Sequence, residues 1–151
     1  MGIDPRGPRF GALITTVVLA VVLITGSVWL LAAQAVVFAV GSAFGLRYAP
    51  YGVLYRRLIR PRLGPPKELE AEAPPRFAQT VGLAFAVVGV AGYAAGLTWL
   101  GAAATAAALA AAFLNAVFGF CLGCEMYLLI RRIWPGRRML TPADADQEVN
   151  A

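Results

Sequence analysis

The sequence predicts an all-α integral membrane protein in which four transmembrane helices form two similar hairpins, with an additional interfacial helix on the cytoplasmic side. Three observations predict this class. Of 151 residues, 60% are hydrophobic and only 14% are charged, whereas soluble domains average roughly 45–50% and about 25%. The mean hydropathy is +0.70, and the uncharged residues gather in four long runs. A soluble enzyme is therefore excluded.

The four runs predict the membrane-spanning helices. They are Phe10–Ile24, Ser27–Leu46, Phe77–Tyr93 and Leu97–Ile130, the last interrupted only by Glu125. A hydrocarbon core of ~30 Å needs about 20 helical residues, so the first run is short and the last is over-long. Lipid offers no partner for backbone polar groups, which must then pair within a helix.

Short turns and one long loop divide the chain. Thr25-Gly26 separates the first two runs and Ala94-Ala95-Gly96 the last two, which indicates tight helical hairpins. The segment Arg47–Arg76 holds six prolines and seven of the 13 lysines and arginines, and is predicted to be a loop. The expected organisation is one membrane domain and one tail: 1–134, comprising hairpin 10–46, basic loop 47–76 and hairpin 77–134, and a disordered cytoplasmic tail, 135–151.

The distribution of charge predicts the orientation. All 13 lysines and arginines lie in the N-terminal arm, in the central loop or after the fourth run, and neither hairpin turn carries one. By the positive-inside rule these segments face the cytoplasm, so we expect a multi-pass plasma-membrane protein with both termini inside. The alternative is a signal peptide cleaved near Ala33-Gln34-Ala35. It is disfavoured because the apolar run continues to Leu46.

The two hairpins share an internal sequence repeat. Four pairs of short motifs recur in the same order: Pro8-Arg9-Phe10 with Pro75-Arg76-Phe77, Trp29-Leu30 with Trp99-Leu100, Gly41-x-x-x-Gly45 with Gly119-x-x-x-Gly123, and Leu54-Tyr55-Arg56-Arg57 with Leu129-Ile130-Arg131-Arg132. The repeat predicts a pseudo-twofold axis along the membrane normal.

The basic loop contains an amphipathic pattern. Apolar residues recur at 51, 54, 55, 58 and 59, and the opposite side of the helical wheel carries Arg56, Arg57 and Arg60. We expect a helix that Pro61 ends, lying in the cytoplasmic interface with these arginines on anionic headgroups of the lipid bilayer. The alternative is a docking surface for an acidic cytosolic partner. Nucleic acid is not indicated, because the basic residues lie where the positive-inside rule requires them.

Polar and small residues inside the spans indicate helix packing. The amides Gln34, Gln79 and Asn115 are expected to be interhelical hydrogen-bond partners, with a transport path as the alternative. Small residues dominate the second hairpin. They favour close packing within the four-helix unit, with a homo-oligomer as the alternative.

One group of nearby side chains is capable of chemical reaction, namely Cys121, Cys124 and Glu125. On a continuous helix Cys121 would stack on both other residues. A helix starting near Thr98 would place Cys121 about 35 Å along its axis, at the inner headgroup level. Near a helix C-terminus and beside an acid, the thiolate would be disfavoured.

Three interpretations of the cysteine pair stay open. A reversible dithiol/disulfide is geometrically allowed. A metal is not expected in a single chain, since zinc needs more ligands than Cys121 and Cys124 supply unless a symmetric dimer forms. The third interpretation is that the cysteines serve only in packing. No histidine is present, and the sequence identifies no cofactor.

The segment from Pro8 to Trp134 resembles a known but uncharacterised family. Its motif Phe120-Cys121-Leu122-Gly123-Cys124-Glu125 is similar to that of small actinobacterial membrane proteins classed as a domain of unknown function. The resemblance implies thiol or sulfur handling, because family members are encoded beside rhodanese-type sulfurtransferases or thioredoxin-like proteins. It implies such proteins as partners, and it supplies no catalytic residues.

Together these arguments predict a membrane-bound accessory factor in thiol redox or sulfur transfer. Cys121 and Cys124 are the expected reacting pair, and Glu125 is the expected proton acceptor or modulator of thiol acidity. The alternative is a non-enzymatic membrane scaffold or assembly subunit that docks a cytosolic partner through its basic loop. The sequence does not decide whether the protein is an enzyme.

Overall fold

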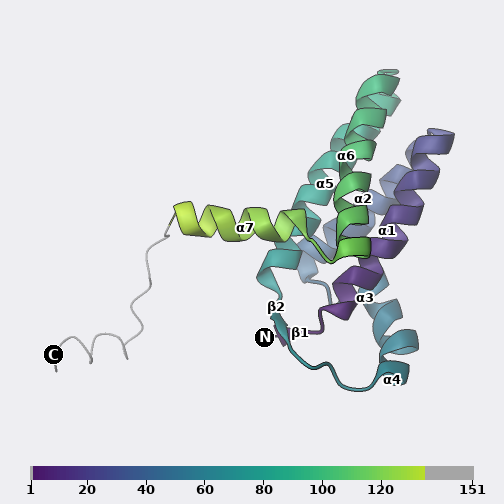
Figure 1. Cartoon of the computed structure of the whole chain (residues 1–151). Helices are drawn as coiled ribbons and strands as arrows, with labels where there is room; N and C mark the ends of the chain where they lie inside the picture. The colour runs from purple at the N-terminus through teal and green to yellow at the C-terminus, as the bar shows by residue number, and fades with distance from the viewer. Residues whose placement is uncertain (1, 135–151) are drawn as a thin grey trace.

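The computed structural model describes residues 2–134 and shows a bundle of four long helices. These are α1 (Arg6–Thr25), α2 (Val28–Phe44), α5 (Ala73–Ala94) and α6 (Thr98–Phe118), which run side by side (Figure 1). Helices α1, α5 and α6 are long and apolar enough to cross a membrane, and α2 is a shorter apolar helix of 17 residues. The predicted all-α membrane fold is therefore confirmed.

Glycines form the two predicted hairpin turns. Gly26 ends α1 in the left-handed conformation, with φ 64°, and its N–H donates to the carbonyl of Val22. The hydroxyl of Ser27 then accepts from the N–H of Leu30 and caps the start of α2. Gly96, with φ 79°, makes the corresponding turn between α5 and α6. Both positions favour glycine because a Cβ is strained at positive φ.

The fourth run is two helices, so the predicted single helix Leu97–Ile130 is wrong. Helix α6 ends at Phe118, and α7 (Leu122–Ile133) leaves the bundle sideways at a steep angle to α6 (Figure 1). Gly119 makes the break in the left-handed conformation, with φ 67°. One helix over the whole run would measure about 50 Å, whereas α6 measures about 31 Å and matches a ~30 Å hydrocarbon core.

The basic loop is more ordered than predicted. Helix α3 (Pro50–Leu54), the π-helical turn η1 (Tyr55–Ile59) and α4 (Arg60–Leu63) form one continuous helical segment. The expected end at Pro61 is wrong because, just before it, the N–H of Arg60 donates to the carbonyl of Tyr55, five residues back. This wider turn lets the helix continue past a residue that has no N–H.

A small sheet that the sequence did not predict ties the N-terminal arm to the basic loop. Strand β1 (Gly2–Ile3) pairs antiparallel with β2 (Glu70–Ala71), with Gly2 opposite Ala71 and Ile3 opposite Glu70. Both strands and α4 lie at the same end of the bundle (Figure 1). The arm and the loop thus form one layer below the helices.

The bundle packs across the two hairpins. Helix α1 packs mainly against α6, and α2 packs mainly against α5, while α5 and α6 also pack against each other. The buried core residues lie where these helices meet: Leu19, Val22, Leu31, Phe38, Ala86 and Ala108. Because α1 corresponds to α5 and α2 to α6 in the repeat, the α1–α6 and α2–α5 contacts are equivalent.

Aromatic contacts support the predicted repeat and extend it to a third element. The rings of Phe10 and Tyr55 lie 5.8 Å apart at an interplanar angle of 45°. The rings of Phe77 and Tyr127 lie 5.7 Å apart at 47°. The same contact therefore joins α1 to the helical segment after α2, and α5 to α7. Each half of the molecule consists of a hairpin followed by a shorter helix.

An arginine near the start of each hairpin lies against the end of the other hairpin. Arg76 donates to the carbonyl oxygens of Ser42 at 2.7 Å and Ala43 at 2.6 Å, near the C-terminus of α2. The guanidinium of Arg9 lies beside Gly119, at the C-terminus of α6. Cations at these ends are favourable for the exposed carbonyls and the helix dipole. The predicted tail, 135–151, lies outside the described residues.

Candidate functional site: a disulfide at the start of α7

The break in the fourth run places Cys121 at the N-terminus of a helix. Gly119 and Phe120 donate their N–H groups to the carbonyls of Asn115 and Leu114, which closes α6. Cys121 follows in an extended conformation, φ −90° and ψ 99°, as the N-cap of α7. The expected position near a helix C-terminus is wrong, because the helix that holds the cysteines begins with them.

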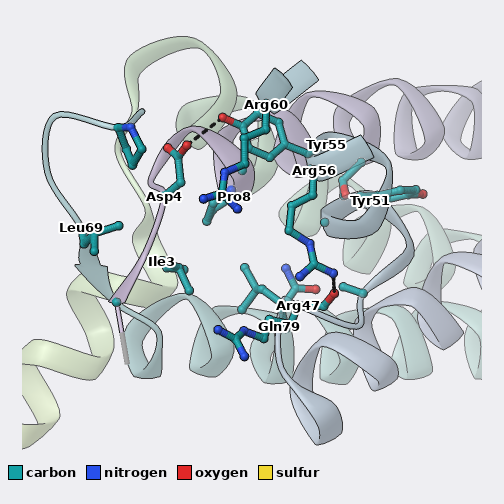
Figure 2. A pocket seen from close by; sticks show the side chains of 18 of the residues that line it. Ile3, Asp4, Pro8, Arg47, Tyr51, Tyr55, Arg56, Arg60, Leu69 and Gln79 are labelled. Atoms are coloured by element: carbon teal, nitrogen blue, oxygen red, sulfur yellow. Dashed lines mark hydrogen bonds between the residues drawn. The ribbon is translucent and has the colours of Figure 1, made fainter. Parts of the chain in front are cut away.

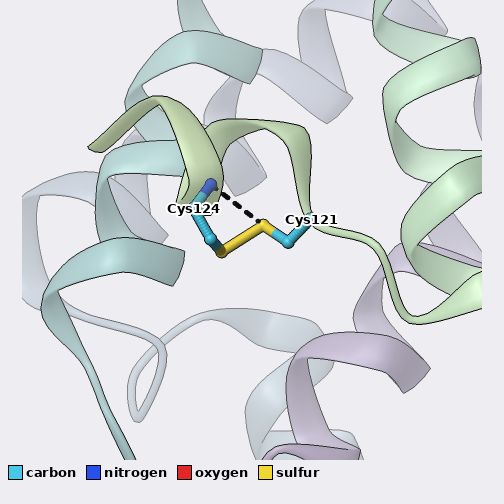
Figure 3. Close-up of a disulfide and its surroundings, with 2 residues drawn as sticks. All are labelled: Cys121 and Cys124. Carbon is cyan, nitrogen blue, oxygen red and sulfur yellow. Dashed lines mark hydrogen bonds between the residues drawn. A yellow bond between two sulfur atoms is a disulfide. The ribbon is translucent and has the colours of Figure 1, made fainter. Parts of the chain in front are cut away.

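Cys121 and Cys124 form a disulfide, with their Cα atoms 5.1 Å apart (Figure 3). This separation lies in the usual range for disulfides. The Sγ of Cys121 also accepts a hydrogen bond from the N–H of Cys124 at 3.3 Å. Both residues are half-buried. The predicted pair is thus brought together, and its two members differ, because only Cys121 takes the capping position.

Glu125 lies in the first turn of α7, next to the pair. Its backbone N–H donates to the carbonyl of Cys121 at 3.0 Å, and its side chain is exposed. The structure therefore places the three predicted residues within one helical turn. Among residues 2–134, no group of three or more histidine, cysteine, aspartate or glutamate side chains is arranged to hold a metal ion, so this part of the chain supplies no metal site for the zinc interpretation.

Helix α7 is amphipathic. Its large apolar side chains that are exposed are Leu122, Met126, Leu128, Leu129, Ile130 and Ile133. Cys124 and Arg131 are seven residues apart and share a side of the helix, while Leu122, Met126, Leu129 and Ile133 define another. The sequence analysis missed this helix because it placed these residues at the end of a span.

A cavity of about 270 Å³ lies against the disulfide. Cys121, Gly123 and Met126 form one wall, and the four long helices supply the others, mainly through small residues of α6 and through Phe38 and Phe85. Three polar side chains line it, those of Thr15, Gln79 and Asn115. The disulfide is therefore at the edge of an apolar space and not only at the protein surface.

The three predicted hydrogen-bonding amides behave differently. Buried Gln34 donates to Thr15 at 3.4 Å and accepts from Tyr51 at 2.7 Å, as expected for an interhelical contact. Gln79 and Asn115 make no side-chain hydrogen bond to another group within residues 2–134, which corrects the expectation for both. Their amides line the cavity beside the disulfide instead.

A second cavity of about 270 Å³ adjoins the first and is basic. Arg47, Arg56 and Arg60 surround it, together with Tyr51, Tyr55 and Gln79 (Figure 2). Arg56 also donates to the carbonyl of Arg47. Of the three arginines predicted to bind the membrane surface, Arg56 and Arg60 line this cavity, and Arg57 is exposed outside its lining. Arg47 was not predicted.

One acidic residue in the lining of this second cavity, Asp4, is the centre of a small hydrogen-bond network. Asp4 accepts from Arg6 in an ion pair at 3.0 Å and from the hydroxyl of Tyr55 at 3.0 Å. Burial raises the pKa of Asp4, but these hydrogen bonds outweigh burial and hold it below its ordinary value. Burial, reinforced by Asp4, raises the pKa of Tyr55 and keeps its hydroxyl a donor. No sequence pattern predicted this network.

Comparison with known proteins agrees with the resemblance noted from the sequence. Residues 3–132 match the model of a domain of unknown function, DUF4395, and the chain belongs to this family. Neither a curated protein nor a solved structure matches the chain. The chemistry of the site therefore has to be argued from its own residues.

Proposed function

We propose that this member of the DUF4395 family is a membrane-bound thiol–disulfide relay, in which Cys121 and Cys124 alternate between a disulfide and two thiols. The observation that supports it is the disulfide at the N-cap of α7, in contact with a backbone N–H. A structural disulfide would need no such placement. Reactive cysteines, by contrast, commonly lie at helix N-termini, where the thiolate is stabilised.

The two sulfurs take different roles. A thiolate of a soluble dithiol protein attacks the Sγ of Cys124, which shares a side of α7 with Arg131 and is not part of the cavity lining. The S–S bond breaks, and Cys121 leaves as a thiolate that the Cys124 N–H and the helix dipole stabilise. The partner's second thiol then attacks its own bridging sulfur, and Cys124 leaves. The relay has gained two electrons and two protons, and the partner holds the new disulfide.

Partners of two kinds suit this chemistry. A thioredoxin-like protein would supply the dithiol directly. A rhodanese-type sulfurtransferase would instead transfer the outer sulfur of its persulfide to a reduced cysteine, and its own cysteine would leave as a thiolate. We favour the dithiol partner, because the pair is held as a disulfide and can accept electrons without prior reduction. Exposed Glu125, one residue from Cys124, is the proposed proton acceptor.

We further propose that four helices cross the plasma membrane with both termini and α7 on the cytoplasmic side. The support is the charge distribution: every lysine and arginine lies outside the hairpin turns. The end of the bundle that carries the disulfide also carries the basic cavity, whose arginines suit anionic headgroups. Cys124 then faces the cytosol, where soluble dithiol proteins are available.

Thiol trapping on the full chain in native membranes tests the relay. We expect the pair to be found as a disulfide, to become doubly alkylated after a reduced thioredoxin-like dithiol is added, and to re-form when an excess of the oxidised dithiol protein replaces it. With the oxidised partner, Cys121→Ser should form a mixed disulfide, because the remaining thiol of Cys124 attacks the partner's disulfide, and Cys124→Ser should form much less. An added mass of one sulfur atom would instead identify sulfur transfer.

Two results would overturn the relay. One is a pair that stays oxidised under the dithiol protein while a small reductant reduces it. The other is a pair of single variants that trap no partner. Alkylation of the reduced chain with a membrane-impermeant maleimide tests orientation separately. Inside-out vesicles should label, and right-side-out vesicles should not.

A further inference from the structure

The cavity beside Cys121 indicates which electron acceptor the proposed relay uses. We propose that it binds the ring of a membrane-soluble quinone, which takes two electrons from the reduced Cys121–Cys124 pair. The inference rests on the proposed function and deepens it by naming the class of the second substrate. Four features of the cavity support it, namely its position, its opening, its amides and its contact with one of the two cysteines.

The exposed residues that line the cavity are apolar. These residues, which form its rim, include Phe85, Leu122 and Met126, at 39%, 38% and 45% exposure. All three are apolar and lie on α5 and α7. A ligand that enters here would come from the hydrocarbon phase and not from water. This favours a lipid-soluble carrier over a soluble nucleotide or a free anion.

Two amides distinguish the expected ligand from an acyl chain. Besides Thr15, the polar side chains that line the cavity are Gln79 and Asn115, and neither of these amides has a side-chain hydrogen-bond partner within residues 2–134. A polar group in an apolar site is unfavourable unless it is hydrogen-bonded. A hydrocarbon chain cannot satisfy these amides, whereas a quinone presents two carbonyl oxygens that accept from amide N–H groups.

Small residues on α6 leave room for a flat ring. Ala107, Ala108, Ala111 and Ala112 line the cavity on one side, and Phe38 and Phe85 line it on others. Larger side chains at the alanine positions would fill the space. The volume of about 270 Å³ suits a ring headgroup whose tail extends out through the rim. This volume is slightly below the ~300–1,000 Å³ that is usual for sites that enclose a whole ligand, as expected if only the ring is enclosed.

The disulfide lies between two environments. Cys121 lines the cavity, and Cys124 shares a side of α7 with Arg131. A soluble dithiol can therefore meet one cysteine while the quinone meets the other. This explains why the pair is placed at a helix start at the membrane boundary instead of in a cytosolic domain.

The reaction balances without a further reagent. The two thiols lose their protons and two electrons, and the S–S bond between Cys121 and Cys124 forms. The quinone gains the two electrons, and each carbonyl oxygen gains one proton, so hydroquinone leaves through the rim. Together with the dithiol exchange, the net reaction oxidises a soluble dithiol and reduces a membrane quinone.

Anaerobic quinone reduction by the full purified chain tests the inference. The chain is reduced, freed of reductant and mixed with decylbenzoquinone, and hydroquinone is followed by absorbance while disulfide formation is followed by mass. We expect one hydroquinone per chain. Ala111→Phe, which fills the cavity, should slow the reaction at least tenfold. Ala110→Phe is the matched control, because Ala110 is exposed and outside the lining.

A second variant covers the case in which Ala111→Phe fails to fold. Asn115→Leu removes one amide and should raise the quinone concentration needed for half-maximal rate, with dithiol exchange unchanged. Equal rates in the wild type, Ala111→Phe and Asn115→Leu would overturn the quinone site. So would a wild-type chain that exchanges with dithiols but reduces no quinone, an outcome that leaves the relay intact. Absence of dithiol exchange would instead overturn the relay.

Discussion

The two halves of the molecule use one backbone arrangement for different chemistry. In the first half, α1 and α2 lead to the helical segment Pro50–Leu63, and in the second half α5 and α6 lead to α7. If Tyr55 and Tyr127 are aligned through their matching contacts with Phe10 and Phe77, residue 49 corresponds to residue 121. Both are N-caps, of α3 and α7 respectively.

The difference lies in the side chains at that helix start. Ala49 and Gly52 in the first half correspond to Cys121 and Cys124 in the second. The first half surrounds its cavity with Arg47, Arg56 and Arg60, whereas the second half places a disulfide beside an apolar one. The repeat therefore supplies the position, and the residues at that position give an arginine-lined cavity in one half and a disulfide in the other.

The largest effect is expected when the cysteine pair is moved to the first half. In a chain with Cys121→Ser and Cys124→Ser, we expect Ala49→Cys with Gly52→Cys to prevent folding. A Cβ on residue 52 would collide with the backbone carbonyl oxygen of Leu46, which cannot move without the turn before α3. Size-exclusion chromatography in detergent and a count of free thiols would measure the outcome.

Ala49→Cys alone is the control for this transfer. Residue 49 already carries a Cβ, so this variant should elute and melt like its parent. A folded double variant with a complete disulfide would contradict the expectation. It would show that either helix start can accept the pair, and that the restriction to the second half is not steric.

Equivalent helix contacts in the two halves provide the next test, with a smaller effect. A Cβ on Gly123 of α7 would lie 2.6 Å from the Cα of Ala78 on α5, whereas in the matching contact of the first half a Cβ on Gly11 would lie 3.7 Å from the Cβ of Tyr51. Gly123→Ala should therefore separate α7 from α5 and lower the free energy of unfolding by about 2 kcal/mol. Gly11→Ala should change it little.

Thermal unfolding in detergent, followed by circular dichroism, would compare the two glycine variants. Gly123→Ala should also make the Cys121–Cys124 disulfide easier to reduce, because the helix that carries it is no longer held. Equal melting temperatures would contradict the close approach of α7 to α5. They would place α7 free of the bundle.

The sequence predicted the bundle well because spans and turns follow from composition. Four uncharged runs and the glycine turns at residues 26 and 96 need only local chemistry and the thickness of a bilayer. The break at Gly119 was missed because the residues around it are as apolar as the span itself. The excess length of the last run was the available signal, since it could not fit one membrane crossing.

Much of the candidate site could not be predicted from the sequence, because it depends on the break at Gly119 and on tertiary packing. The motif identified Cys121, Cys124 and Glu125, but their position at a helix start depended on the missed break. The two cavities depend on tertiary packing, as do the hydrogen-bond partners of Asp4 and Gln34. Arg47, 13 residues before Arg60, is brought to the same cavity only by the folding of the loop.

Arginines at the hairpin starts give a third comparison. Arg76 donates two hydrogen bonds to carbonyls near the end of α2, while Arg9 lies beside Gly119 with no side-chain hydrogen bond within residues 2–134. Arg76→Gln should lower the free energy of unfolding by about 1 kcal/mol, and Arg9→Gln by less. Thermal melts of the two variants measure this difference. Equal decreases in the free energy of unfolding would mean that the two arginines stabilise the protein only through their positive charge and not through hydrogen bonds.

The smallest expected effect is one of pH, and it belongs to the first half alone. Hydrogen bonds from Arg6 and Tyr55 hold the pKa of Asp4 below its ordinary value of 3.8. A carboxyl whose pKa is lowered on folding stabilises the protein above its unfolded pKa, and this contribution is lost as the pH falls through the folded value. The stability of the wild type should therefore decrease between pH 5 and pH 3 more steeply than that of Asp4→Asn. Melting temperatures across this interval would show the two curves converging at the acid end. Parallel curves would show that Asp4 titrates alike in the folded and unfolded chain, and would remove the network that distinguishes the first half.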